Sequence, residues 1–499
     1  MTNFTLIQLS SQIQTIQTNF NHFFLIMNGI IVLFMQPGFA LLECGSVRSK
    51  NATNILVKNM LDAFISGIAY WLFGWAFAYG EGNYFLGLEH FALYNLPESE
   101  YARWFFQYVF AATASTILSG SLAERCNTTA YFTYSFLISG FIYPVVSHWA
   151  WHENGWLKMG SGDAGYQDFA GSGVVHVCGG ACALVGAVLL GPRLGRFDPE
   201  TKEAKDIRGH SIPLAITGGM LLLIGFLAFN GGSLGHIDEP SDGEIVALCV
   251  SNTTISGCFG GLTVLILVRI GVLGDPKVIS AIHSMNGALA GMVAVCAGVD
   301  KYHLWGAMLV GMIGGIIYLL MHQLVLRLKI DDPLDAIAVH LGGGAWGVLA
   351  APIFAKTDGI LINASHKSAY DFAWNIAGIL AIFAWCTGWS LIMFGVLKYS
   401  GQLRVDYDAE VQGLDIIKHN EPAYPAESWF EEQYQTVSNK SAQKRRNSIS
   451  PFDIALPPHM RAAKKSLDHI FNNIDAGVPN KSFVSEDPKE TTSNDTTNF

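Results

Sequence analysis

Two histidines stand in matching stretches of small and apolar residues. The stretch VVHVCGGA contains His176 and the stretch AVHLGGGA contains His340, so the pattern Val-His-x-x-Gly-Gly-Ala occurs twice. An aspartate precedes each histidine by eight residues, Asp168 in the first copy and Asp332 in the second. Imidazole can donate, accept or relay a proton near neutral pH. The duplication therefore predicts one proton-handling site built from two matching segments.

The composition of the chain indicates a membrane protein. Of its 499 residues, 51% are hydrophobic and only 14% are charged, and the mean hydropathy is +0.32. This is too apolar for an ordinary soluble protein. Apolar runs of about 20 residues predict an all-α polytopic membrane protein with eleven transmembrane helices. The expected spans lie near residues 22–42, 59–79, 104–122, 129–148, 169–190, 213–234, 245–268, 278–298, 304–326, 335–354 and 372–398.

The distribution of basic residues predicts the orientation of these spans. With the N-terminus outside, the outer loops carry only Arg103, Lys158, Lys301, Lys356 and Lys367, and the inner loops carry many more. The positive-inside rule then places the C-terminus in the cytoplasm. The formal charge of -10 resides partly in acidic outer loops, which is not the pattern of a nucleic-acid-binding protein.

The two histidine segments also suggest an internal repeat. His176 falls in the fifth expected span and His340 in the tenth, and an odd offset reverses the direction in which a helix crosses the bilayer. We therefore expect two inverted five-helix repeats whose pathway lies at their interface. The expected parts are residues 1–21 (extracellular segment), 22–200 (first repeat), 201–371 (second repeat), 372–399 (eleventh helix), 400–425 (cytoplasmic regulatory segment) and 426–499 (disordered cytoplasmic tail).

Other chemistries fit the sequence less well. Zinc needs three or four ligands, and no Cys, Asp or Glu accompanies either histidine at helical spacing within its span. We interpret the eight cysteines as small packing residues. The glycines beside the histidines, and the pair Gly287 and Gly291, are interpreted as helix-packing positions. No cofactor fingerprint, metal set or catalytic nucleophile is recognised, so we expect a protein that is not an enzyme.

Several segments taken together resemble the ammonium transporter (Amt) family, and within the Amt/Mep/Rh superfamily its eukaryotic-type Amt branch. They are FALLECGSVRSKNATNILVKN, SGSLAERC, YPVVSHWAW, DFAGSGVVHVCGGACALVGAVLLGPR, FNGGSLG, DDPLDAIAVHLGGGAWG and QLRVDYDAEVQGLDIIKHNEPAY. The resemblance extends from about residue 22 to residue 425. It implies a homotrimer in the lipid bilayer, expected in the plasma membrane, in which each subunit has its own pore for ammonium or ammonia, with methylammonium as a further substrate.

The resemblance also implies roles for individual residues. These are ammonium recruitment at Trp151, Ser233, Phe106 and Phe110, a stacked gate at Phe110 and Phe229, and a histidine-lined pore at His176 and His340. Asp168 precedes FAGSG, so we expect it to cap a helix rather than to bind the ion directly. Trp151 with Ser233 favours the Amt branch over the Rh branch. Ile417 stands where plant relatives carry a phosphorylated threonine, so that switch is not expected here.

Physical chemistry favours passage of ammonia over passage of a bare cation. Dehydrating an ion in an apolar pore costs on the order of tens of kcal/mol in the Born limit, whereas deprotonating ammonium near pH 7 costs roughly 3 kcal/mol. The sequence leaves the net transported species open. An ammonium sensor that signals through the tail is the alternative, and a membrane enzyme is a distant third. Ser448 in RRNSIS is a candidate site for a protein kinase.

Overall fold

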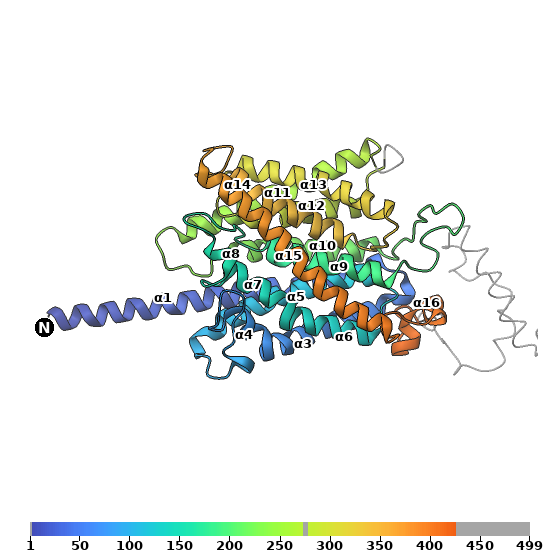
Figure 1. Cartoon of the computed structure of the whole chain (residues 1–499), viewed down its shortest axis with the longest axis horizontal. Coiled ribbons are helices and arrows are strands. Elements are labelled where there is room, and N and C mark those ends of the chain that lie inside the picture. The colour runs from blue at the N-terminus through green and yellow to red at the C-terminus, as the bar shows by residue number, and fades with distance from the viewer. Residues whose placement is uncertain (1, 273–277, 426–499) are drawn as a thin grey trace, which may run out of the picture. The chain divides into compact units, whose positions relative to one another are not determined.

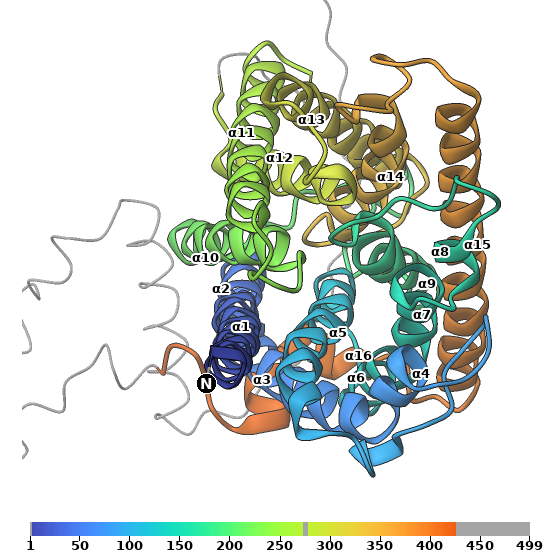
Figure 2. The same cartoon turned by 90° about the vertical axis from the view of Figure 1, so that its left-hand side faces the viewer.

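The apolar segments fold as helices that lie side by side in one bundle, as the computed structural model shows along and across the helix axes (Figures 1 and 2). The structure describes residues 2–272 and 278–425, and within them only isolated β-bridges accompany the helices. The expected disordered tail (426–499) and Ser448 lie outside the described residues.

The first half of the chain contains α1 (Thr2–Leu33), α2 (Met35–Ser46), α3 (Ala52–Ala69), α4 (Trp75–Tyr79), α5 (Tyr101–Leu122), α6 (Thr128–Leu137), α7 (Tyr143–Trp151), α8 (Trp156–Met159) and α9 (Cys178–Leu190). The second half contains α10 (Ile212–Gly232), α11 (Asp242–Arg269), α12 (Ala281–Val295), α13 (Leu304–Arg327), α14 (Gly343–Phe354), α15 (His366–Tyr399) and α16 (Tyr407–Gln412). Turns of π-helix occur at η2 (Tyr70–Gly74), η5 (Ile138–Ile142), η6 (Ser172–Val177), η8 (Ile337–Gly342) and η9 (Asp415–His419). Short 3₁₀ turns occur at η1 (Ser49–Asn51), η3 (Phe91–Leu93), η4 (Glu98–Glu100) and η7 (Cys296–Gly298).

Ten helical segments of the described residues are long and apolar enough to cross a membrane. They coincide with ten of the eleven expected spans. The remaining one, α5, is less apolar because polar side chains line it. Thr116 and Ser115 of α5 donate hydrogen bonds to the buried carboxylate of Asp62 on α3. These bonds hold α5 inside the bundle although its composition is only moderately hydrophobic.

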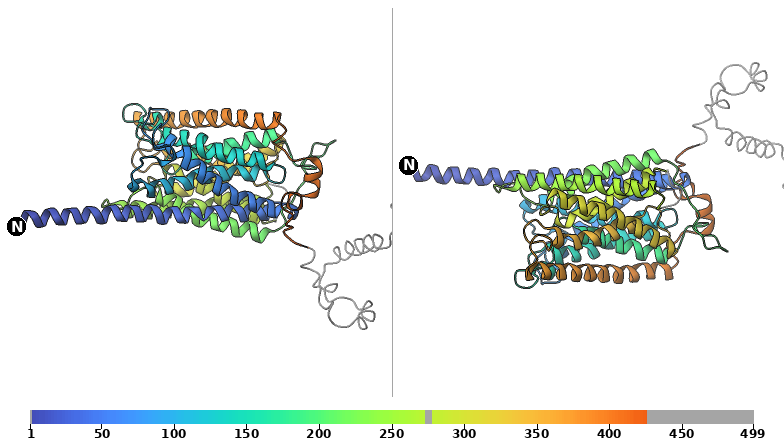
Figure 3. Two further views of the ribbon diagram at one scale, coloured as in Figure 1. Left: turned by 90° about the horizontal axis from the view of Figure 1, so that it is seen from below. Right: turned by 90° about the horizontal axis from the view of Figure 1, so that it is seen from above.

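The N-terminal helix begins earlier than the sequence suggested. We expected a span near residues 22–42 after an extracellular segment, but helix continues from Thr2 to Leu33 and, after a break at Phe34, to Ser46. Pro37 lacks a backbone N–H, which accounts for a break close to this point. The first part of α1 projects beyond the other helices (Figure 3).

Helix starts in the second half follow local capping chemistry. The side chain of Ser211 accepts from the backbone N–H of Leu214 at the start of α10, and Ser280 does the same for His283 at the start of α12. A capping box that joins Ser365 and Ser368 opens α15. Serine hydroxyls satisfy N–H groups that have no partner within the helix. These caps fix the ends of the helices that surround the site.

The loops at the α16 end of the bundle are joined by a buried ion-pair network. The guanidinium of Arg193 lies 2.8 Å from Asp331 and 2.9 Å from Glu124, and Glu124 also pairs with Arg48. Arg125 donates to the backbone carbonyl of Asp331 at 2.7 Å. Buried charges require such pairing. The network links loops from both halves of the chain.

The segment 400–425 packs on this same end. The backbone N–H of Leu194 donates to Glu410 at 2.7 Å, and that of Asn54 donates to Asp415 at 2.8 Å. Asn51 accepts from the backbone of Leu414. The tail therefore contacts the loops of its own chain that follow α2 and α9.

Candidate functional site

The two matched histidines meet in the interior of the bundle. Their Nδ1 atoms lie 3.1 Å apart, and the ring centroids lie 5.2 Å apart with an angle of 21° between the planes. His176 is fully buried and His340 is 7% exposed. Each histidine occupies a turn of π-helix, η6 for His176 and η8 for His340. Such turns are rare and occur frequently at functional sites.

Matched glycines bring the two histidine segments together. Gly180 and Gly344 each follow their histidine by four residues. A Cβ on Gly180 would overlap the backbone of Leu341, the residue after His340. A Cβ on Gly344 would overlap the backbone oxygen of Ser172 and approach the backbone of Val177, the residue after His176. The contact is therefore reciprocal, as expected for segments related by a pseudo-twofold axis.

Aspartates at matched positions cap the two segments. The carboxylate of Asp168 accepts hydrogen bonds from the backbone N–H groups of Gly171, Gly173 and Val174 at 2.8–3.0 Å. Burial raises the pKa of Asp168 above its ordinary value, although the three N–H groups oppose the shift. Asp332 accepts from the backbone of Ile337 at 2.7 Å. Both carboxylates are thus committed to backbone geometry near the histidines.

The geometry of the histidine pair restricts its protons. Two nitrogens 3.1 Å apart share a single hydrogen, because one must donate and the other must accept. With both rings neutral, the outer nitrogen of one ring is then an acceptor and that of the other ring is a donor. Cys296 lies 4.0 Å from Nε2 of His176 and is a weak partner at most. The pair can therefore accept a proton at one end and release a proton at the other.

Aromatic rings extend from the histidines in a column. His176 stacks on Phe229 with centroids 5.5 Å apart, and Phe229 stacks on Phe110 at 4.2 Å and 26°. Phe110 meets the ring of Trp151 edge-on at 6.0 Å and lies 4.9 Å from Phe106. The order from one end is Trp151, Phe110, Phe229 and His176. The sequence-predicted aromatic residues and the histidines thus form one continuous series of contacts.

A cavity of about 440 Å³ opens at the Trp151 end of this column. Five of the predicted site residues line it, and they are Phe106, Phe110, Trp151, Asp168 and Ser233. We call it the vestibule. Its charged lining side chains are Arg103, Lys158 and Lys301 against Asp168 and Asp300. The lining itself is therefore not strongly acidic, so attraction of a cation here has to rely on π faces and oxygen acceptors.

Hydrogen bonds orient the side chains of Trp151 and Ser233 in the vestibule. The indole N–H of Trp151 donates to the backbone carbonyl of Asp168 at 2.7 Å, which fixes the plane of the ring. The hydroxyl of Ser233 donates to the carbonyl of Phe229 at 2.7 Å, so its oxygen keeps lone pairs that can accept from a ligand. An aromatic face and a hydroxyl acceptor suit a small cation with N–H donors.

A much smaller cavity, about 20 Å³, lies beyond His340 on the opposite side from the vestibule. Phe39, Leu334 and Asn286 are among its lining residues. The narrow apolar space continues the direction of the column toward the α16 end. The residue Phe39 lies 6.4 Å from the ring of His340.

Several residues at the site were not found from the sequence. Phe226 stacks against His176 at 5.6 Å, and Cys296 lies 4.0 Å from Nε2 of the same ring. Phe39 lines the small cavity beyond His340, and Arg103 lines the vestibule. Phe226 stands one helical turn before Phe229, and this i, i+3 spacing was available as a signal. The others carry no local pattern that separates them from ordinary core or loop residues.

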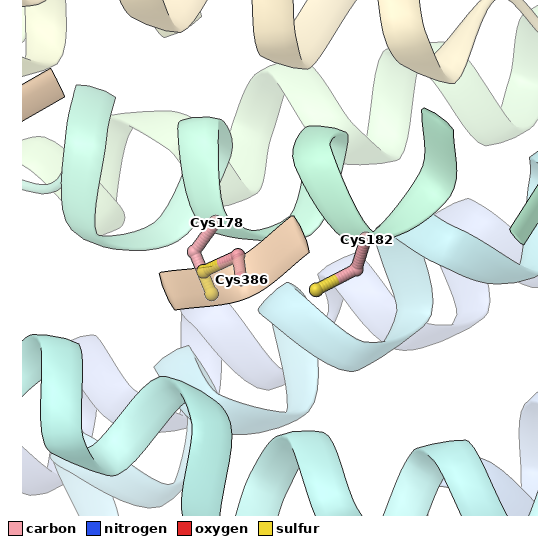
Figure 4. Close-up of side chains that lie close together, drawn as sticks. All are labelled: Cys178, Cys182 and Cys386. Carbon is pink, nitrogen blue, oxygen red and sulfur yellow. The ribbon is translucent and has the colours of Figure 1, made fainter. Parts of the chain in front are cut away.

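Three cysteines also come together outside the column. Cys178 and Cys182 on α9 and Cys386 on α15 are fully buried, and their sulfur atoms lie within 4.8 Å of one another (Figure 4). The sequence shows the spacing of the first two, but Cys386 is too distant along the chain to be associated with them. All three sulfurs lie away from both cavities described above.

Comparison with known proteins agrees with the geometry. The model of the Ammonium Transporter Family matches residues 23–424. A Caenorhabditis elegans protein whose name contains "ammonium transporter 1" is 46% identical over 86% of this chain and 84% of its own length. Ammonium transporter 1 member 3 of Solanum lycopersicum is 37% identical over 84% of this chain and 95% of its own.

A solved structure named Sensor Amt Protein superposes with a TM-score of 0.75 at 34% identity, and the match covers 81% of this chain and all (100%) of that one. Saccharomyces cerevisiae Mep2 gives a TM-score of 0.69 at 26% identity, with 78% and 88% coverage. The family model spans most of the described residues, and the relatives are matched over most of their length. The chain therefore belongs to the ammonium transporter family.

Proposed function

We propose that the protein is a membrane transporter or channel for ammonium, with a pathway that runs from the vestibule through the aromatic column to the histidine pair. The single observation that carries the proposal is the continuous contact series of Trp151, Phe110, Phe229, His176 and His340. In a family of ammonium transporters this series supplies recruitment, a gate and proton-handling groups in spatial order.

Each part of the pathway has a distinct physical task. Ammonium is held in the vestibule by the indole face of Trp151, worth about 0.5–2 kcal/mol, and by the oxygen of Ser233. The stacked pair Phe110 and Phe229 fully occludes the way inward, since both rings are buried to 1% exposure or less. Ring movement opens it to a small molecule. Beyond the gate, the histidine pair accepts the proton or holds ammonia.

Proton loss gives the pathway its selectivity. A potassium ion has no proton to release, so it would have to enter the apolar column with its charge, which costs several kcal/mol or more. Ammonium can leave its proton for about 3 kcal/mol near pH 7. The same column therefore excludes one cation and passes the other in its neutral form.

We propose the topology and assembly that the sequence predicts. Eleven spans, the ten apolar segments and α5, would put the two termini on opposite sides of the membrane, and the positive-inside rule favours an outer N-terminus and a cytoplasmic tail. The matched π-turns, glycines and aspartates support the inverted repeat. Exposed apolar side chains along α1, α10 and α15, among them Met220, Ile224 and Leu391, suit contact with lipid or with the other subunits of a homotrimer in the plasma membrane.

An ammonium sensor is the second candidate function. A relative of similar fold is named Sensor Amt Protein, and here the tail is bonded to loops that join the pore helices. A change near the pore could thereby reach the tail. Transport remains the better-supported function because the column is continuous.

Uptake of labelled methylammonium by cells that lack their own ammonium transporters tests the proposal. We expect saturable uptake that ammonium inhibits and potassium does not. Current recorded in the same cells decides whether charge moves with the substrate. Surface expression without uptake or current would contradict transport, and a ligand-dependent change in tail accessibility in that case would support the sensor.

A further inference from the structure

Two histidines and one aspartate that the pathway does not use converge at the α16 end of the bundle. His283 lies in the first turn of α12, His322 lies near the end of α13, and Asp335 lies just before η8. One nitrogen or oxygen atom from each lies within 4.8 Å of the corresponding atoms of the other two. Their rings and carboxylate come from three packed elements, so the arrangement does not depend on a single loop.

Neighbouring groups hold the three side chains in place. His322 Nδ1 lies 2.6 Å from Asp335, and His283 Nδ1 lies 2.7 Å from the hydroxyl of Tyr318. That hydroxyl donates to Asp335 at 2.8 Å, and Asn286 donates to the same carboxylate at 3.3 Å. Tyr318 and Asn286 form a second layer of hydrogen bonds of the kind that commonly orients metal-binding side chains. The bond between His322 and Asp335 instead joins two members of the cluster.

The three side chains are accessible from a cavity of about 450 Å³, which we call the tail-side cavity. His322 and Asp335 keep 16% and 14% of their side-chain surface exposed. Among the described residues that line the cavity, each guanidinium is paired with a carboxylate, and the two kinds of charge are equal in number. They are Arg193, Arg196 and Arg208 against Asp206, Asp332 and Asp335, and Asp331 behind the lining pairs with the first two arginines. A divalent cation that reaches the cluster therefore meets no unpaired guanidinium among these residues.

We propose that His283, His322 and Asp335 bind a divalent transition metal ion of the zinc class. Two imidazoles and a carboxylate are ligands that zinc and its first-row neighbours prefer, whereas Mg²⁺ and Ca²⁺ prefer oxygen ligands alone. Tetrahedral zinc places its ligand atoms about 3.4 Å apart. Adjustments of roughly 1 Å bring the three groups to that spacing, and water from the cavity supplies the fourth ligand.

The position of the site gives a bound ion a route to act on transport, a consequence that rests on the proposed function. Asn286 contacts both Tyr318 and Asp335 and also lines the small cavity beyond His340. An ion that binds Asp335 shifts the carboxylate out of its present hydrogen bonds and releases Asn286 from it at the exit of the pathway. Binding therefore slows the release of substrate on the α16 side.

The purified full-length chain in detergent provides the first test, with Co²⁺ as a spectroscopic stand-in for Zn²⁺. We expect one ion per chain, with the visible absorption of tetrahedral Co²⁺ and without the near-ultraviolet band that thiolate ligands produce. His283→Gln and His322→Gln should each weaken Zn²⁺ binding at least about tenfold. Mg²⁺ should not compete.

Two other clusters serve as matched controls. His236→Gln alters a cluster with Asp238 and Asp242 at the opposite end of the bundle, and Cys386→Ser alters the buried thiol cluster. Neither control substitution should change the affinity of the protein for Zn²⁺. Loss of binding in either control, or full affinity in both His283→Gln and His322→Gln, would overturn the assignment. Gel filtration and thermal unfolding establish that each variant is folded.

Transport in proteoliposomes provides the second test. With Zn²⁺ on the α16 side, we expect methylammonium uptake by the wild type to fall relative to uptake with a chelator, and the ratio to approach one in His322→Gln. Absence of uptake with chelator would refute the proposed function and leave the binding result standing. Uptake that Zn²⁺ does not change, in a protein shown to bind it, would refute the effect on release.

Discussion

At the scale of single residues, the sequence predicted which side chains lie together in the column but not how they touch. The repeated motif predicted that His176 and His340 belong together, and the family resemblance placed the aromatic residues near them. A shared N–H between the two imidazoles was predictable, but not that the two Nδ1 atoms share it, because ring orientation depends on packing against Phe226 and Phe229 in the fold.

Replacement of the histidines should show that they act as one unit. We expect His176→Ala and His340→Ala each to lower uptake, and the double variant to cost little more than the worse single change, because either loss already breaks the shared hydrogen bond. Potassium exclusion should also weaken as the column admits water. Uptake and currents at matched surface expression measure this. If the losses of uptake are additive and potassium is still excluded, the two rings serve only to pack the core.

Replacement of Trp151 should affect recruitment alone. Trp151→Leu keeps bulk but removes the cation–π face, so the half-saturation concentration for ammonium should rise about 2- to 30-fold, as expected from about 0.5–2 kcal/mol. Ser233→Ala should act in the same direction and more weakly. Concentration series of uptake provide the measurement, and an unchanged half-saturation in Trp151→Leu would remove the indole from the site.

At the scale of elements, apolar runs predicted the spans, including the one that forms α5, and the differences lie at helix ends and turns. The hydrogen bonds from α5 to Asp62 could not be predicted, because a hydropathy window does not register contacts between helices. The early start of α1 lies in a polar segment that the apolar-run criterion ignores. The π-turns at η6 and η8 have no sequence signal of their own beyond the glycines that permit their crossing.

Those glycines provide a test of the crossing. Gly180→Ala and Gly344→Ala each place a methyl group against the other segment's backbone, so each should cost about 1–3 kcal/mol of stability and separate the imidazoles. Uptake should fall in both. Gly388→Ala on α15, where a Cβ meets no atom within 4 Å, is the matched control and should be neutral. Similar behaviour of all three variants would refute the close crossing.

The loop network should respond to pH in a defined direction. Burial alone raises the pKa of Asp331, but the hydrogen bonds and charges of Arg193 and Arg125 outweigh it and lower the pKa to about 2, from an ordinary 3.8. A lowered pKa in the folded state stabilises the protein above about pH 4, and this stabilisation is lost as the pH falls toward 2.

Asp331→Asn should therefore destabilise the protein by about 2 kcal/mol at pH 7, since it removes one of the two carboxylates that pair with Arg193 and leaves only Glu124. The difference in stability between Asp331→Asn and the wild type should become smaller below about pH 4. Thermal unfolding in detergent at several pH values measures it. Asp206→Asn, which breaks an exposed pair with Arg208, should have little effect. A deficit that does not change with pH would contradict the ion-pair explanation.

At the scale of the whole molecule, the tail can regulate the pore only if transport depends on the hydrogen bonds between the tail and the loops. The sequence predicted a regulatory segment at 400–425, and its docking partner could not be derived because Glu410 and Asp415 bond to backbone groups, which leave no pattern in the sequence.

Truncations separate the parts of the tail. Deletion from Gln402 removes the bonds of Glu410 and Asp415 and should lower transport in a protein that still reaches the surface. Deletion from residue 430 leaves these bonds intact and should preserve transport. Surface labelling and uptake measure both. Equal transport by the two truncated proteins would contradict the division of the tail into a regulatory segment (400–425) and a remainder that transport does not need.

The shared hydrogen between the imidazoles has a consequence for how often the pair can act. A proton that arrives at one outer nitrogen and leaves from the other reverses the polarity of both rings, and the pair then faces the wrong way for a second proton. Resetting requires a proton to pass through the pair in the opposite direction or both rings to turn over, and the packing of His176 against Phe226 and Phe229 opposes ring turning. Passage of neutral ammonia leaves the protonation of both imidazoles unchanged, so it requires no reset. The stacking around His176 therefore slows successive proton transfers through the pair, whereas it does not slow the passage of neutral molecules.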